Sequence, residues 1–229
     1  MGGLVSLETR LSCNDGIIWS LSRSMMNPMA IYLIRHGETP LNAKRVIQFP
    51  DTPLSDRGQA QARALGERLS TAPVGAIVTS DYQRAYMTAD AVRKTTDAPM
   101  EIETTLRERN FGDLRGQAFA DLDEDPFAPG YAPPNGETWE VFHERAASSW
   151  DAVTALAARV EGDVVAVTHG LVLRSLCAHV LSLGDGIQAE GATFMNTCLT
   201  RVEGPPWEVS LLACDLHLEG DLRATGGKV

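Results

Sequence analysis

Two short runs of the sequence place a histidine and a glycine directly after a stretch of apolar residues. They are Arg35-His36-Gly37, after residues 30–34, and Thr168-His169-Gly170, after residues 163–167. A parallel strand buried on both faces is apolar until it leaves the sheet, and ligands bind at that carboxyl edge. The guanidinium of Arg35 suits phosphate or carboxylate oxygens, and His36 would then act as nucleophile or proton carrier. For the first run alone, the alternative is a strand end with one exposed histidine.

A third apolar run, residues 75–79, ends at Ser80 and is followed by Arg84. Ser80 and Gln83 have the spacing of a capping box, which predicts a helix from 81 to about 95 with Ser80 as its N-cap. Arg84 would lie in the first turn, where the amides of a helix N-terminus attract anions. We therefore expect three strands to bring Ser80, Arg84 and the two histidines to one edge of a sheet.

The rest of the chain alternates strand and helix patterns, which predicts a three-layer α/β/α sandwich around a mostly parallel central sheet. Helices are expected over 56–70, where Ser55 is a suitable N-cap, over 138–160, and from 170 to about 182. Strands are expected near 100–103, 195–202 and 207–214. The last two have no helix between them, which predicts an antiparallel hairpin at the edge of the sheet. The acidic, proline-containing segment 117–137 is predicted to form a lid over one end of the sheet.

Composition and charge limit the classes of function. The chain has 229 residues, 44% of them hydrophobic and 22% charged, which is ordinary for a globular protein. Its net charge of -10 argues against nucleic acid or a membrane surface as a partner, so an anionic substrate would need a local positive pocket. Its cysteines lack metal-binding spacing, and Cys177, Cys198 and Cys214 lie among apolar residues, so we expect buried free thiols and a cytoplasmic location. The oligomeric state stays open between a monomer and a homodimer.

We divide the chain into three parts. Residues 1–28 have no basic n-region and no uninterrupted apolar run, which argues against a signal peptide or membrane span. We expect either a disordered extension or a start codon upstream of the native one, with initiation at Met25, Met26 or Met29. Residues 29–218 are expected to form a single domain, and the glycine-rich residues 219–229 a flexible tail.

The motifs along this domain resemble those of a known family. They are Arg35-His36-Gly37-Glu38-Thr39, Asn42, Asp51-Thr52-Pro53-Leu54-Ser55, Gly58-Gln59-Ala60, Ser80-Asp81, Arg84-Ala85, Glu108, Gly112, Gly116 and Thr168-His169-Gly170. In this order they resemble the histidine phosphatase superfamily (phosphoglycerate mutase-like, branch 1), and the pattern is most similar to its broad-specificity phosphatases. The resemblance covers residues 30 to about 180, so we expect residues 29–218 to be a histidine phosphatase domain.

The resemblance implies a role for each catalytic candidate. His36 would attack phosphorus and form a phosphohistidine, while Arg35, Arg84 and His169 offset the phosphate charge. Glu108 looks like the family's general acid and base, which requires a raised pKa in the first step. We expect a metal-independent phosphomonoesterase without a cofactor, acting on a small phosphorylated metabolite. Its candidate substrate-binding residues are Gly37, Thr39, Asn42 and Gln48.

Two alternatives to a phosphatase stay open. One is a 2,3-bisphosphoglycerate-dependent phosphoglycerate mutase; the other is a non-catalytic scaffold that binds phosphorylated ligands. No Lys or Arg occurs from Gln117 through Glu144, so an acidic lid would repel a second anionic group and favour hydrolysis, unless remote arginines compensate. The aromatic residues Phe119, Phe127, Tyr131 and Trp139 would suit an apolar or neutral leaving group, although core packing explains some of them equally well.

Several other polar residues have simpler interpretations. His143, His179 and His217 match no family motif and are expected on helix faces or the surface. Arg107, Arg109 and Arg115 either border the site or are solvated, and Glu38 is either a cap or a local ion-pair partner. The carboxylates of Asp121, Asp123, Glu124 and Asp125 lack the spacing of a calcium loop, so we expect solvated side chains and no metal.

Overall fold

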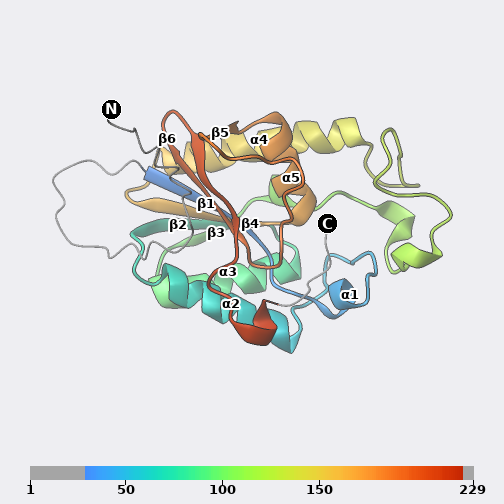
Figure 1. Ribbon diagram of the computed structural model, residues 1–229, viewed down its shortest axis with the longest axis horizontal. Coiled ribbons are helices and arrows are strands. Elements are labelled where there is room, and N and C mark those ends of the chain that lie inside the picture. The colour runs from blue at the N-terminus through green and yellow to red at the C-terminus, as the bar shows by residue number, and fades with distance from the viewer. Residues whose placement is uncertain (1–28, 224–229) are drawn as a thin grey trace, which may run out of the picture.

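The computed structural model describes residues 29–223 and shows helices on both faces of one twisted sheet (Figure 1). Its seven strands lie in the order β3-β2-β4-β1-β6-β7-β5. The strands are β1 (Met29–Arg35), β2 (Val74–Thr79), β3 (Met100–Ile102), β4 (Asp163–Thr168), β5 (Ser182–Leu183), β6 (Leu199–Gly204) and β7 (Glu208–Cys214). The helices are α1 (Pro40–Ala43), α2 (Asp56–Leu69), α3 (Gln83–Thr96), α4 (Trp139–Ala157) and α5 (Gly170–His179). The predicted three-layer α/β/α sandwich with a mostly parallel sheet is confirmed.

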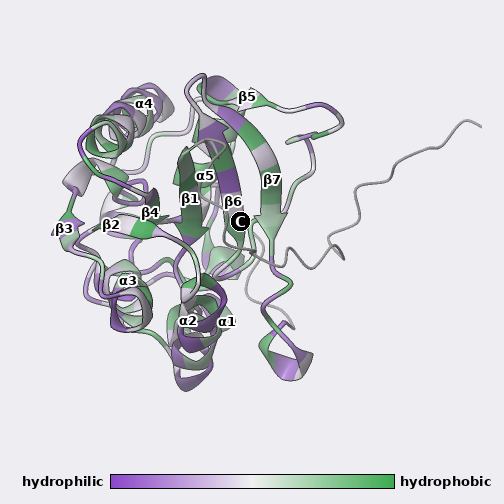
Figure 2. Ribbon diagram, turned by 90° about the vertical axis from the view of Figure 1, so that its left-hand side faces the viewer, coloured by the Kyte–Doolittle hydropathy of each residue, from purple (hydrophilic) through white to green (hydrophobic). Residues whose placement is uncertain are grey.

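The central strands are apolar on both faces because each face is covered by helices. Alternate residues of β1 point to opposite sides: Ile31 and Leu33 join the core under α4 and α5, whereas Tyr32 and Ile34 join the core over α2 and α3. Figure 2 shows the two helix pairs on either side of the sheet. Parallel pairing of β1 with β4, and of β4 with β2, brings the carboxyl ends of these three strands together.

The C-terminal strands differ in part from their predicted arrangement. β6 and β7 form the expected antiparallel pair, but β6 also pairs with the central β1, so the hairpin lies inside the sheet. The strand at that edge is β5, which pairs with β7 and begins at Ser182, the position where the sequence predicts a helix to end. Only two residues long, β5 is too short to give a period-2 pattern, which is why the sequence did not reveal it.

Two predicted boundaries lie at or beyond the ends of the described residues. Residues 1–28, predicted to be an extension, lie outside them, as do residues 224–229. The tail predicted to be loose from Glu219 instead begins with a 3₁₀ turn at Gly220–Leu222. The carbonyl oxygen of Leu222 accepts hydrogen bonds from Arg57 Nη2 at 3.4 Å and Gln61 Nε2 at 3.0 Å, which attaches this turn to α2. None of the helices between residues 29 and 223 is long and apolar enough to cross a membrane.

Candidate active site

Strand register places the ends of β1, β2 and β4 side by side. Arg35 is opposite Thr168 across β1 and β4, and Thr79 is opposite Val167 across β2 and β4. The ladder continues one residue further, because the His36 amide donates to the Thr168 carbonyl at 3.0 Å. His36, Ser80 and His169 are the residues that follow these strands. The structure therefore brings together the strand-end residues that the sequence predicted to share one edge.

The His36 ring is held in one protonation state. Its Nδ1 lies 2.7 Å from the carbonyl oxygen of Gly37, so Nδ1 carries the proton and donates it. Its Nε2 lies 3.3 Å from Nε of Arg84, a nitrogen that can only donate, so Nε2 offers its lone pair. Burial lowers the pKa of His36 well below its ordinary value, and the charges of Arg84 and Arg35 lower it further. A neutral imidazole with Nε2 unprotonated is the form that a nucleophile needs.

Two buried arginines supply positive charge beside this ring. Nη1 of Arg35 donates to the Phe194 carbonyl at 2.5 Å, and Nη1 of Arg84 donates to the Phe49 carbonyl at 3.0 Å. Burial lowers the pKa of both guanidiniums, that of Arg84 to about 10, so Arg84 remains protonated at neutral pH. Two buried guanidinium groups beside one imidazole ring form a natural binding site for an anion.

His169 lies opposite His36, with the two ring centroids 5.2 Å apart. Its Nε2 is 3.0 Å from the hydroxyl oxygen of Ser80, and that oxygen also accepts a hydrogen bond from the Tyr82 amide at 3.2 Å. The Ser80 hydroxyl can donate to Nε2, and in that arrangement the ring proton is on Nδ1. This buried Nδ1 has no hydrogen-bond partner among residues 29–223. Burial, together with Arg84, lowers the pKa of His169 well below its ordinary value.

Ser80 thus differs from its predicted role. Helix α3 begins at Gln83, its N-cap is Tyr82, and no side chain caps it. The capping-box prediction is wrong because the Ser80 hydroxyl bonds to the Tyr82 amide and to His169 instead. Arg84 nevertheless lies in the first turn of α3, as expected.

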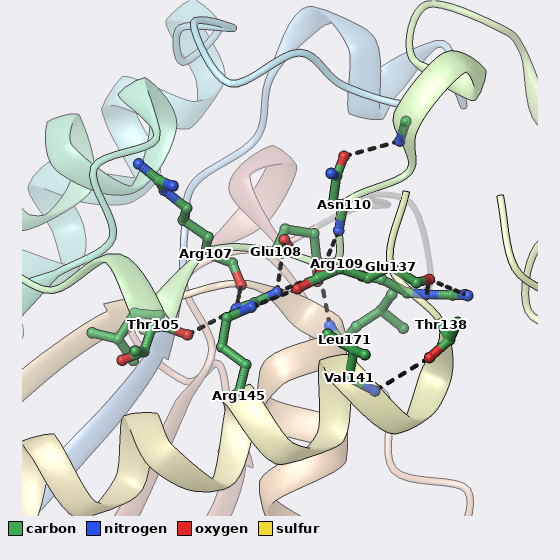
Figure 3. Close-up of polar contacts among 12 residues, drawn as sticks. Thr105, Arg107, Glu108, Arg109, Asn110, Glu137, Thr138, Val141, Arg145 and Leu171 are labelled. Atoms are coloured by element: carbon green, nitrogen blue, oxygen red, sulfur yellow. Dashed lines mark hydrogen bonds and ion pairs between the residues drawn. The ribbon is translucent and has the colours of Figure 1, made fainter. Parts of the chain in front are cut away.

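Glu108 lies in the loop between β3 and α4, with its carboxyl group held by two backbone amides. Oε1 accepts from the Arg109 amide at 2.9 Å, and Oε2 accepts from the Leu171 amide, in the first turn of α5, at 3.4 Å (Figure 3). Burial raises the pKa of Glu108 above its ordinary value, although both amides and the Arg84 charge act in the opposite direction. A carboxyl group whose pKa is raised by desolvation can serve as a proton donor near neutral pH.

The candidate substrate-binding residues fall into two groups. Asn42 and Gln48 line a cavity beside Arg84 and Glu108. Thr39 and Gly37 have structural partners: the Thr39 hydroxyl caps α1 through the Asn42 amide at 3.0 Å and donates to Gln48 at 2.7 Å. The Gly37 amide donates to the Thr88 hydroxyl at 3.0 Å. Gly37 also passes close to α2, since a Cβ on it would lie 2.7 Å from the Gly58 carbonyl oxygen.

The cavity has an arginine-rich and aromatic lining. Its lining residues are Asn42, Arg45, Val46, Ile47, Gln48, Tyr82, Arg84, Glu108, Arg109, Phe111, Arg115, Phe119, Phe127 and Leu171. The segment 117–137 contributes Phe119 and Phe127 to it, while its acidic residues Asp121, Asp123, Glu124 and Asp125 are exposed and do not line it. The lid therefore presents aromatic rings to the cavity and its charges to solvent, which removes the basis for a repulsive acidic lid.

Several residues at the site gave little signal in the sequence. Asn196 precedes β6, and its Nδ2 donates to the His36 carbonyl at 2.9 Å and to Asn42 Oδ1 at 3.4 Å. It lies in a loop with no recognisable motif. Thr88 could have been found, because it is one helical turn after Arg84 and so lies on the same face of α3. Arg45 is a charged residue of the cavity lining that the sequence did not single out.

The remaining polar residues mostly follow their simpler interpretations. Glu38 forms an ion pair with Arg57 at 3.3 Å, and His179 is exposed. His143 lies on α4 with Nδ1 2.8 Å from the Ser175 hydroxyl, and burial lowers the pKa of His217 to about 4. Arg109 is not solvated: its side chain is buried, the residue is 1% exposed, and its guanidinium donates to backbone carbonyls.

Known structures with this architecture are phosphoglycerate mutase-fold proteins. A protein titled YhfR from Bacillus stearothermophilus superposes with a TM-score of 0.71 at 31% identity, covering 83% of this chain and 100% of its own. A structure titled phosphoglycerate mutase from Bacillus anthracis gives a TM-score of 0.69 at 25% identity, covering 82% and 93%. Among sequence relatives, "Probable phosphoglycerate mutase GpmB" of Photorhabdus laumondii is 30% identical over 80% of this chain and 89% of that protein.

A match to a family model over nearly the whole domain shows which family the chain belongs to. The profile described as "Histidine phosphatase superfamily (branch 1)" matches residues 31–215. "Uncharacterized phosphatase PhoE" of Bacillus subtilis is 29% identical over 85% of this chain and 99% of its own length. The chain belongs to the histidine phosphatase superfamily, branch 1, as its motifs led us to expect.

Proposed function

We propose that this enzyme hydrolyses small phosphate monoesters through a phosphohistidine on His36. The observation that carries the proposal is the state of the His36 ring, with Nδ1 tied to the Gly37 carbonyl and Nε2 unprotonated beside Arg84. Arg35, Arg84 and the Nδ1–H of His169 would bind the phosphoryl oxygens, and Asn42 and Gln48 would contact the substrate. No step in this proposal requires a metal ion or a cofactor.

In the first step, Nε2 of His36 attacks phosphorus in line and the bond from phosphorus to the ester oxygen breaks. The ester oxygen leaves with the proton of Glu108. Negative charge on the transferred group spreads over its three remaining oxygens, where preorganised cations stabilise the transition state most strongly.

In the second step, water replaces the alcohol. The Glu108 carboxylate takes a proton from the water molecule while the water oxygen bonds to phosphorus. The bond from phosphorus to Nε2 breaks, releasing inorganic phosphate, and both His36 and Glu108 return to their starting protonation states. One carboxyl group thus serves first as acid and then as base.

A panel of phosphorylated metabolites, with released phosphate measured, tests this function. Similar structures are titled as a mycobacterial glucosyl-3-phosphoglycerate phosphatase and a putative alpha-ribazole-5'-P phosphatase from Escherichia coli, so the panel should include both substrates. We expect phosphate release from at least one class of monoester and none from the Glu108→Ala and His36→Ala double variant. Binding of phosphorylated compounds without turnover would favour the scaffold alternative, which the presence of all five catalytic candidates argues against.

Mutase activity is the second candidate, and the cavity lining supports it. Arg45 and Arg115 both line the cavity, and within residues 29–223 neither forms an ion pair with a carboxylate. Both arginines lie outside the lid segment 117–137, and their guanidinium groups could hold the carboxylate of a phosphoglycerate. Incubation with 3-phosphoglycerate and catalytic 2,3-bisphosphoglycerate decides the matter: rapid 2-phosphoglycerate formation with little free phosphate would identify a mutase. The cytoplasmic location and the homodimer stay predictions.

A further inference from the structure

The loop that carries Glu108 is attached to helix α4 by a partly buried ion pair between Arg145 and Glu137. Nε of Arg145 donates to Oε1 of Glu137 at 2.8 Å, and Nη2 donates to Oε2 at 2.6 Å, so the pair is bidentate. The two side chains are only 21% and 16% exposed. Burial opposes ionisation of Glu137, but the hydrogen bonds from Arg145 and the Asn110 amide, together with the charges of Arg145 and Arg109, outweigh it and lower the pKa of this carboxyl. A bidentate pair fixes the relative orientation of the two side chains as well as the distance between them.

Arg145 and Glu137 also bind the backbone on both sides of Glu108. Nη1 of Arg145 donates to the carbonyls of Thr105 at 2.8 Å and Arg107 at 2.7 Å. Nη2 reaches the carbonyl of Glu108 itself at 3.3 Å. On the other side, Oε2 of Glu137 accepts from the Asn110 amide at 2.8 Å. Figure 3 shows Arg145 extending from α4 into this loop.

The same pair is joined to the lid. The Glu137 carbonyl accepts from Nε and Nη2 of Arg109, at 3.1 and 3.0 Å. Arg109 also donates to the carbonyls of Pro126 at 2.9 Å and Tyr131 at 2.6 Å, and its guanidinium lies 3.8 Å above the Trp139 ring. The loop before Glu108, the residues after it and the segment 117–137 therefore share one network.

We propose that Arg145 and Glu137 are positioning residues that aim the Glu108 carboxyl group at the ester oxygen. The proposal rests on the function proposed for Glu108, and it extends that function to two residues that act through the loop backbone. Apart from the backbone amides of Arg109 and Leu171, nothing within residues 29–223 hydrogen-bonds to the Glu108 carboxyl, so its position depends on the backbone of its own loop and on the first turn of α5. Proton transfer demands hydrogen-bond geometry, and a displacement of about 1 Å costs about 100-fold in rate.

The test compares leaving groups in Arg145→Lys, Arg145→Ala and Glu137→Gln. Phosphoenzyme formation is followed in the pre-steady state with glycerol phosphate, whose alkoxide needs a proton, and with 4-nitrophenyl phosphate, whose phenolate does not. We expect the rate with glycerol phosphate to fall about 10- to 100-fold while the rate with 4-nitrophenyl phosphate stays within about 3-fold. Arg145→Lys should retain more activity than Arg145→Ala, because an ammonium can keep the ion pair but not the fork of contacts.

The matched control is Arg93→Lys, which alters a different arginine–carboxylate pair, on helix α3, with Arg93 Nη2 2.7 Å from Asp90 Oδ1. It should leave both rates unchanged. Equal losses with the two leaving groups, or a raised KM with an unchanged rate of phosphoenzyme formation, would overturn the positioning role. Failure of the wild-type enzyme to form a phosphoenzyme with either substrate would instead refute the proposed function. The rate with 4-nitrophenyl phosphate also reports whether each variant is folded.

Discussion

Nε of Arg84 lies 3.3 Å from Nε2 of His36, on the side of the ring opposite the bond from Nδ1 to the Gly37 carbonyl. This contact has two consequences. A guanidinium next to Nε2 disfavours a proton there, which keeps the proposed nucleophile neutral. The same guanidinium can turn to a phosphoryl oxygen once substrate binds beside Nε2, so the cation that protects the free ring also stabilises the transferring group.

The first prediction concerns His36 as the nucleophile. His36→Ala should lower the rate by at least about three orders of magnitude, because both steps of the mechanism pass through its Nε2. Wild-type enzyme quenched with alkali during turnover should carry one phosphate on His36, identified by mass spectrometry of the peptide. The matched control is His179→Asn, which removes an exposed histidine and should retain activity. A His36→Ala enzyme with near-normal turnover would refute the mechanism.

The second prediction concerns pH. The pKa of His36 is lowered, so its neutral form persists below its ordinary titration range, and activity should fall only at more acidic pH. The pKa of Glu108 is raised, so its protonated form persists above its ordinary range, and activity on alkyl phosphates should fall as pH rises through that pKa. The pH profile of kcat/KM should thus be bell-shaped.

Glu108→Gln separates this effect from ionisation of the substrate, which is the same for both enzymes. The variant should be slower by about 10²- to 10⁴-fold and should lose the part of the alkaline limb that Glu108 causes. An alkaline limb that is identical in the two enzymes would assign it to the substrate or to another residue.

The sequence predicted the strand-end residues of the site because their positions follow from short-range rules. Buried parallel strands are continuous apolar runs, and the first polar residue after each run marks the carboxyl edge. Parallel pairing of β1, β2 and β4 then brings His36, Ser80 and His169 together without any further information.

What the sequence could not show depends on tertiary contacts. The Ser80 hydroxyl had two uses, capping a helix or binding a ring that is distant in sequence, and the pattern gave only the first. The charge of the lid alone predicts repulsion of anions, but side-chain direction decides which groups face the cavity: Phe119 and Phe127 line it, while Asp121 and Asp123 are exposed. Asn196 lies in a loop without a motif, and the contacts of Arg145 are to backbone carbonyls distant in sequence, which no local pattern predicts.

The third prediction concerns Ser80, whose hydroxyl lies 3.0 Å from Nε2 of His169. Ser80→Ala removes the hydrogen bond that orients this ring, so kcat should fall by about 2- to 10-fold, the range for one lost hydrogen bond. KM for an aryl phosphate should change less. Ser148→Ala is the control, since that hydroxyl is exposed and donates to the Glu144 carbonyl of its own helix. Unchanged kcat in Ser80→Ala would show that the His169 ring is held by packing alone.

The last prediction concerns Gly58, which lets the first turn of α2 approach the backbone after His36. A Cβ on Gly58 would lie 2.0 Å from the Glu38 carbonyl oxygen, far inside van der Waals contact. That carbonyl accepts from the Ser55 amide at 2.9 Å, and the Glu38 amide donates to Gln61 at 2.9 Å, so the two segments cannot separate without losing these bonds.

Gly58→Ala should therefore destabilise the protein by about 1–3 kcal/mol, the usual cost of overpacking, even though alanine is the better helix former by about 1 kcal/mol. Urea unfolding measures the change. Gln59→Ala, at the next, exposed position of the same helix, should stay within about 0.5 kcal/mol of wild type. Because the strain falls on the backbone that follows His36, kcat of Gly58→Ala should also drop. A variant with wild-type stability and activity would mean that α2 can move away from Glu38 at no cost.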